Sequence, residues 1–140
     1  MFHKKYEDRL QLWSDFRESL ETSKDPFQDV IDFYNQAPTV SIATDPYNRD
    51  TWPDPWQLIQ ENQYCEFCRV LGMCYSLQLT DRFSELDFEI HIGIHKEVAK
   101  TYYLLYINDT VIGYEYDRII DKKDLPELHI QNKYTMSNRH

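Results

Sequence analysis

The spacing of apolar residues changes once along this chain, near residue 74. Before that point apolar side chains recur every three or four residues, and the first such run predicts an amphipathic helix over residues 4–22. After it they alternate with polar side chains, which predicts four half-buried strands over residues 75–80, 88–94, 102–107 and 111–116. Helices followed by a four-stranded antiparallel β-meander make an α+β fold, in which the N-terminal helices pack on one face of the sheet.

Two further helix starts share the pattern Asp-Pro-aromatic-Gln. In Asp25 to Gln28 and again in Asp54 to Gln57, the aspartate can cap a helix and the glutamine can complete a capping box. We expect Asn62 to cap another helix, and Asn108-Asp109 to turn a hairpin between the last two strands. The chain is therefore interpreted as one domain, 1–140, with four parts: a helical part (1–38), an ordered proline-rich extended loop (39–53), a helix with the antiparallel sheet (54–130) and a frayed polar tail (131–140).

Charge and glycine content exclude several classes of ligand. The 140 residues carry 15 Lys and Arg against 24 Asp and Glu, and this net charge of −9 disfavours nucleic acid and anionic lipid. Only three glycines are present, so no glycine-rich loop can hold the phosphates of a nucleotide cofactor. There is no apolar run of membrane-spanning length and no apolar segment typical of a signal peptide. We therefore expect a soluble, intracellular protein with no cofactor, nucleic-acid or membrane partner.

The three cysteines, Cys65, Cys68 and Cys74, are predicted to be reduced thiols because nothing in the sequence indicates secretion. A zinc site needs four ligands, and Cys65 and Cys68 form only one pair. His91 and His95 cannot complete it, since on one strand they would lie about 13 Å apart. No metal site is predicted. A redox function for Cys65 and Cys68 is also disfavoured, because redox Cys-x-x-Cys motifs follow a strand in a parallel βαβ unit and helical residues precede this one.

Cys65 is nevertheless a candidate nucleophile. As the third residue of a helix capped by Asn62, it would lie where free amides and the helix dipole favour a thiolate. His91 could then act as base, with Glu89 or Asp117 as the orienting carboxylate. The alternative is that the cysteines fill small apolar gaps and His91 lies on the sheet surface. The spacing favours this alternative, so Cys65, His91 and Asp117 remain candidates and no catalytic residue is assigned.

Three aromatic residues near the proline-rich loop are candidates for a protein interface. Tyr47, Trp52 and Trp56 belong to the residue types that dominate binding energy at such interfaces. The alternative for the two tryptophans is a hydrophobic staple over the helix that begins at Pro55.

The stretch from Asn62 to Cys68, at a helix start and followed by antiparallel strands, resembles the core of the transglutaminase-like branch of papain-fold proteins. The resemblance covers about half of the chain and implies a nucleophile at Cys65. The histidine of that family would fall at residues 100–101 and its aspartate at residues 115–117. His91 lies one strand earlier. The resemblance therefore implies a scaffold without the catalytic triad.

Two longer stretches, Ser41 to Trp56 and Leu71 to Phe83, are similar to small proteins of contractile-tailed phages that infect marine cyanobacteria. This resemblance implies partners among phage or host proteins and a location in the host cytoplasm or the virion. We therefore expect a non-enzymatic binding or structural protein, a virion or assembly component that acts through protein–protein contacts and can self-associate. Two alternatives remain: a thiol-dependent acyl transferase or amidohydrolase using Cys65, and an acidic inhibitor that mimics nucleic acid towards a host protein.

Overall fold

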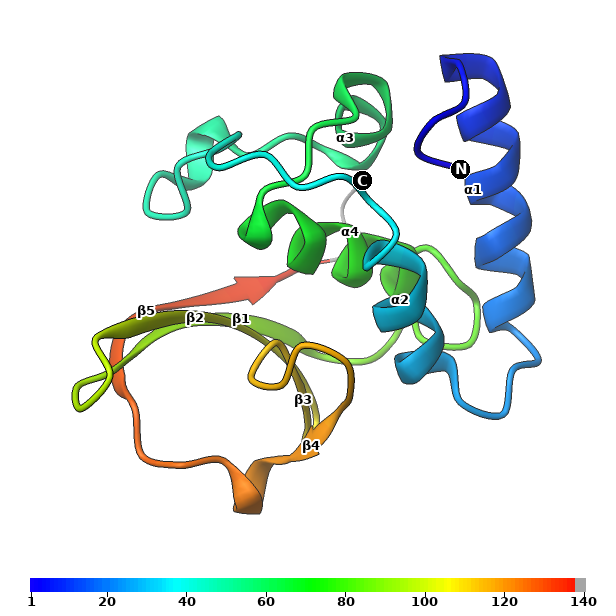
Figure 1. The fold of residues 1–140 in the computed structure, drawn as a ribbon. Coiled ribbons are helices and arrows are strands. Elements are labelled where there is room, and N and C mark those ends of the chain that lie inside the picture. Colours follow the sequence, from blue (N-terminus) through cyan, green and yellow to red (C-terminus); the bar gives the residue numbers. More distant parts are fainter. Residues whose placement is uncertain (138–140) are drawn as a thin grey trace.

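The computed structural model describes residues 1–137, in which four α-helices precede a five-stranded antiparallel sheet (Figure 1). The helices are α1 (Tyr6–Leu20), α2 (Pro26–Tyr34), α3 (Pro55–Glu61) and α4 (Glu66–Gln78). The strands are β1 (Phe88–His95), β2 (Lys100–Ile107), β3 (Thr110–Ile112), β4 (Ile120–Asp121) and β5 (His129–Met136). Two short 3-10 helices, η1 (Arg49–Thr51) and η2 (Lys122–Asp124), lie in connecting segments. The predicted α+β class is confirmed, but the prediction of four strands is not.

The strands lie in the order β4-β3-β2-β1-β5. The predicted hairpin at Asn108-Asp109 joins β2 to β3, and Asn108 adopts the positive φ of 52° that such a turn needs. β3 ends at Ile112, so the strand predicted over residues 111–116 is much shorter. At the following Gly113, with φ of 112°, an added Cβ would lie against the Tyr103 carbonyl.

The predicted frayed tail is wrong for most of its length, because β5 occupies residues 129–136 and pairs with β1 along almost its whole length. Its polar sequence fits an edge strand, where alternate side chains face water and the backbone hydrogen bonds to β1 supply much of the pairing. Residues 138–140 of the predicted tail lie outside the described residues.

The strand predicted over residues 75–80 is also wrong, since α4 continues through this segment to Gln78. Every residue from Val70 to Gln78 is buried, so the alternation of polar and apolar residues does not mark two faces. The buried polar residues have partners in the core: Ser76 accepts from Trp13, and Gln78 Nε2 donates to the Met136 carbonyl over 3.0 Å. In a helix that is buried on all sides, the apolar residues need not recur every 3.6 positions. In this segment polar and apolar residues happen to alternate, which is the pattern of a strand.

The two Asp-Pro starts behave differently. Asp54 forms the predicted capping box, in which its side chain accepts from the Gln57 amide while the Gln57 side chain accepts from the Asp54 amide. Asp25 precedes α2 without any such bond. Asn62 does not cap α4 as predicted: it ends α3 in the left-handed conformation, with φ of 52°. The N-cap of α4 is Cys65 instead.

Helix α4 is the centre of the helical layer, because it contacts α1, α2, α3 and β2 (Figure 1). The main hydrophobic core lies between this layer and the sheet. A second, smaller cluster around Tyr102, Leu104 and Val111 lies on the opposite face of the sheet. The segment between β3 and β5, drawn in orange, arches beneath that face and contributes Ile120, and its Leu125 also packs there (Figure 1). In the described part of the chain, no helix combines the length and the apolarity needed to cross a membrane.

Candidate functional site at the start of helix α4

A pocket of about 350 Å³ lies where the loop between α2 and η1 passes the N-terminus of α4. Its walls come from the loop, from the first turn of α4 and from β2. The loop contributes Ser41, Ile42, Thr44, Asp45, Pro46 and Tyr47; the other lining residues are Cys65, Glu66, Phe67 and Tyr103. The lining is mostly apolar, and its charged side chains are the two carboxylates. This pocket contains a sequence-predicted nucleophile, Cys65, together with a predicted interface residue, Tyr47.

Specific hydrogen bonds hold the loop in place, as the proline content predicted. At its start, Arg69 of α4 donates to the Ala37 carbonyl over 2.5 Å. Next, the Val40 amide donates to the Tyr64 carbonyl over 3.1 Å. Further along, Trp52 Nε1 donates to the Asp45 carbonyl over 3.1 Å. The pocket wall is therefore ordered before any ligand binds.

The two cysteines of the Cys-x-x-Cys pair lie at the start of α4. Cys65 is the N-cap in an extended conformation, and Cys68 lies in the first helical turn. The Cys68 thiol is the main group that lowers the pKa of Cys65; burial opposes it, and the backbone amides of Cys68, Ala43 and Thr44 assist it. The pKa of Cys68 is raised by its bond to Cys65 and by burial. No amide of α4 makes a full capping hydrogen bond to the Cys65 side chain.

The other proposed members of a triad do not reach this pocket. His91 lies on the sheet face away from α4, because it pairs with Leu104 in register and packs on Tyr106, 4.0 Å between ring centroids, beside the second cluster. Its Nε2 lies 2.8 Å from Glu89. Asp117 is exposed, and its carbonyl accepts from Gln28 of α2 over 2.7 Å. The sheet therefore separates Cys65 from His91, and the predicted alternative of a catalytic triad has no geometric support.

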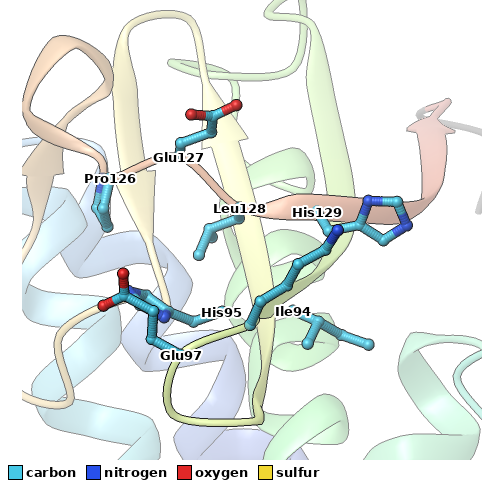
Figure 2. A pocket seen from close by; sticks show the side chains of 8 residues that line it. Ile94, His95, Glu97, Pro126, Glu127, Leu128 and His129 are labelled. Atoms are coloured by element: carbon cyan, nitrogen blue, oxygen red, sulfur yellow. The ribbon is translucent and has the colours of Figure 1, made fainter.

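The sheet carries two other hollows at its far face and its edge. One, of about 560 Å³, holds the His91–Glu89 pair and two lysines. The other, of about 540 Å³, lies between the β1–β2 turn and the segment before β5. Figure 2 shows this second hollow, where the rings of His95 and His129 project in different directions. Within residues 1–137, no group of three or more His, Cys, Asp or Glu side chains could hold a metal ion.

The three aromatic interface candidates occupy different environments. The Trp52 ring is half-buried and packs against Phe67 at 4.9 Å and Tyr134 at 4.7 Å between ring centroids. Trp56 is 42% exposed and touches Trp13 edge-on on the helical side. Tyr47 is 49% exposed and lines the pocket. The three therefore do not form one surface, and Tyr47 alone belongs to the pocket.

Sequence reasoning missed three residues that matter to the pocket. Tyr103 could have been found, because alternation along β2 places it on the helix-facing side, where its ring lies 5.4 Å from Phe67. Ala43 and Thr44 could not, because they act on Cys65 through backbone amides. No sequence pattern reports which loop amides approach a side chain more than twenty positions away.

Comparison of the chain with protein-family models, with curated proteins and with solved structures found no match in any of the three. The interpretation of the pocket therefore depends on its own geometry.

Proposed function

We propose that this protein is a binding protein that docks an apolar segment of a partner protein at the pocket beside α4. The observation that carries the proposal is the exposure of apolar side chains on the ordered loop that forms the pocket wall. Ile42 is 81% exposed, Tyr47 is 49% exposed and Val40 is 37% exposed. Ordered apolar side chains at the rim of an apolar hollow are typical of docking sites.

The size and chemistry of the pocket agree with this role. A volume of about 350 Å³ is enough for one or two side chains of a partner. The floor, with Phe67 and Tyr103, offers aromatic surface, while Asp45 and Glu66 at the rim favour a partner with basic residues next to its apolar segment. Because the loop is already held by hydrogen bonds, little conformational entropy opposes docking.

The setting of this function follows from the phage resemblance. We expect the partner to be a phage or host protein and the site of action to be the host cytoplasm or the virion. A second copy of the chain is a further candidate partner. The enzymatic alternative receives less support, since His91 lies across the sheet from Cys65.

The proposal is tested with a yeast-displayed library of random peptides. The purified chain is used for selection, and binding is then compared with a variant carrying Ile42→Ser and Tyr47→Ser. Val98→Ser is the matched control, because Val98 is 63% exposed at the β1–β2 turn. We expect enriched peptides with adjacent apolar and basic residues, bound about 10- to 30-fold more weakly by the double variant, as for loss of one interface hot spot. Peptides that bind the double variant as tightly as the wild type would refute the proposal, and so would a selection without enrichment.

A further inference from the structure

The part of the sequence-based objection that requires a parallel βαβ unit still holds, because the strands of the sheet pair antiparallel. The part that has helical residues leading directly into Cys65 and Cys68 does not hold. Instead, α3 ends at Asn62, and the following residues are extended, with Tyr64 forming a parallel bridge to Thr39. The chain then turns into α4 at Cys65 itself. Cys65 therefore lies at the N-terminus of a helix, where free amides and the helix dipole favour a thiolate.

We infer that Cys65 and Cys68 form a redox-active dithiol that exchanges with small neutral or cationic disulfides entering the pocket. Residues one helical turn apart have Cα atoms about 5 Å apart, within the range of about 4.4–6.8 Å that a disulfide spans. Cys65 is the N-cap of α4 and Cys68 lies in its first turn, and the Cys68 thiol is the largest influence on the pKa of Cys65. This inference goes beyond the docking function and does not depend on it.

Cys65 is the attacking thiol. Although only 5% exposed, it lines the pocket, and the pocket is therefore the side from which a small disulfide would reach it. Its lowered pKa, due first to the Cys68 thiol, keeps more of it as thiolate near neutral pH than an ordinary cysteine. Its thiolate attacks one sulfur of the incoming disulfide; that S–S bond breaks, a mixed disulfide forms on Cys65, and the first thiolate leaves.

Cys68 completes the exchange. Its pKa is raised first by its bond to Cys65, and this cause disappears once the Cys65 sulfur is bound in the mixed disulfide. The Cys68 sulfur then attacks the Cys65 sulfur, the bond between Cys65 and the external sulfur breaks, and the Cys68 proton goes to that second external sulfur, which leaves as a thiol. In total, two protein thiols lose two electrons and one external disulfide gains them. Cys74, fully buried elsewhere on α4, takes no part.

The charge of the pocket selects the disulfide. Asp45 and Glu66 are the charged side chains that line it, and no lysine or arginine is among its lining residues. Cationic and neutral disulfides therefore approach Cys65 more readily than anionic ones, and the difference decreases as salt is added.

The test uses the full chain, cystamine as a cationic disulfide and oxidised glutathione as an anionic one, with products identified by mass spectrometry and peptide mapping. In the wild type we expect a Cys65–Cys68 disulfide, formed at least about threefold faster with cystamine at low salt. Cys68→Ser should stop at a mixed disulfide on Cys65, and Cys65→Ser should react at least about tenfold more slowly. Glu66→Gln is the matched charge variant and should reduce the preference for cystamine.

Peptide mapping of the wild type keeps the test decisive even where a cysteine variant is poorly folded. A chain that stays fully reduced would overturn the inference, as would a bond that involves Cys74 or a second molecule. Faster reaction with oxidised glutathione than with cystamine would overturn the assignment of the disulfide class.

Discussion

The hydroxyl group of Ser76 connects three helices, and its removal gives a sharp test of how α4 is held. Its Oγ accepts from Trp13 Nε1 of α1 over 2.9 Å and lies 2.9 Å from the Tyr34 hydroxyl of α2. The three residues are between 0% and 1% exposed, so water cannot replace a lost partner. Ser76→Ala should therefore destabilise the fold through an unsatisfied buried polar group.

The magnitude follows from counting the groups left without a partner. The Trp13 N–H also lies within reach of the Tyr34 hydroxyl, so after Ser76→Ala it still has an acceptor, and the Tyr34 proton is the one left unpaired. One buried unsatisfied group costs about 1–3 kcal/mol. The higher helix propensity of alanine offsets a few tenths of a kcal/mol of this cost. We expect a net loss of about 1–2.5 kcal/mol in the free energy of unfolding.

Urea unfolding followed by tryptophan fluorescence measures this loss. With a denaturant slope of about 2 kcal/mol per molar, the midpoint should fall by roughly 0.5–1.2 M. Ser19→Ala on the exposed side of α1 is the matched control and should change stability by less than about 0.5 kcal/mol. In a Tyr34→Phe background, Ser76→Ala should cost a similar amount, because the buried Trp13 N–H then loses its remaining acceptor. A negligible cost in that background, or equal effects of the two serine variants, would refute the reasoning.

Three further predictions concern helix capping, packing and pH. Asp54→Ala should lower the free energy of unfolding by about 0.5–2 kcal/mol in thermal unfolding, because Asp54 forms a capping box. Asp25→Ala should change it little, because Asp25 makes no side-chain capping bond. Gly72→Ala should destabilise by about 1–2 kcal/mol in urea unfolding despite better helix propensity, since the new Cβ would lie 2.7 Å from Cζ of the buried Tyr34 ring; a stabilised variant would contradict this. Burial raises the pKa of Tyr34 and of Tyr64 above the unfolded value of about 10. The contribution of these two groups to the free energy of unfolding is therefore fully present below about pH 10 and is lost as the pH rises above that value. Urea midpoints at pH 8 and pH 11 measure this effect, and equal midpoints would contradict it.

The sequence predicted the elements whose local pattern agrees with their final environment. Helix α1 has one buried and one exposed face, and β1 directs Phe88 and Ile90 to the main core while the polar Glu89 and His91 point to the other face, so their periods of 3.6 and two residues are visible in the sequence. The end of α4 was misassigned because it has no exposed face. Strand β5 was missed for the opposite reason, since its burial is slight and its pairing depends on the open edge of β1. In both segments, tertiary contacts and not the local sequence pattern determine the secondary structure.

The candidate site was only partly predictable for a related reason. The sequence singled out Cys65 and Tyr47 as candidates, and it assigned no catalytic residue. It could not show that Asn62 ends one helix and leaves Cys65 to start the next. That difference of three positions moves Cys65 from the first turn to the cap, where the loop amides reach it.

The proposed docking and redox functions share one pocket, and this allows them to influence each other. Oxidation would replace the polar Cys65 thiolate, which the Cys68 thiol stabilises, by an uncharged disulfide at the pocket floor. A negative charge would disappear next to Glu66 and Tyr103, so a basic partner would lose attraction while an apolar one would gain. Peptides selected on the reduced chain should therefore bind the oxidised chain with altered affinity, and the sign of the change should depend on the number of basic residues in the peptide. Identical affinities for both forms would mean that the thiol pair and the docking surface act independently.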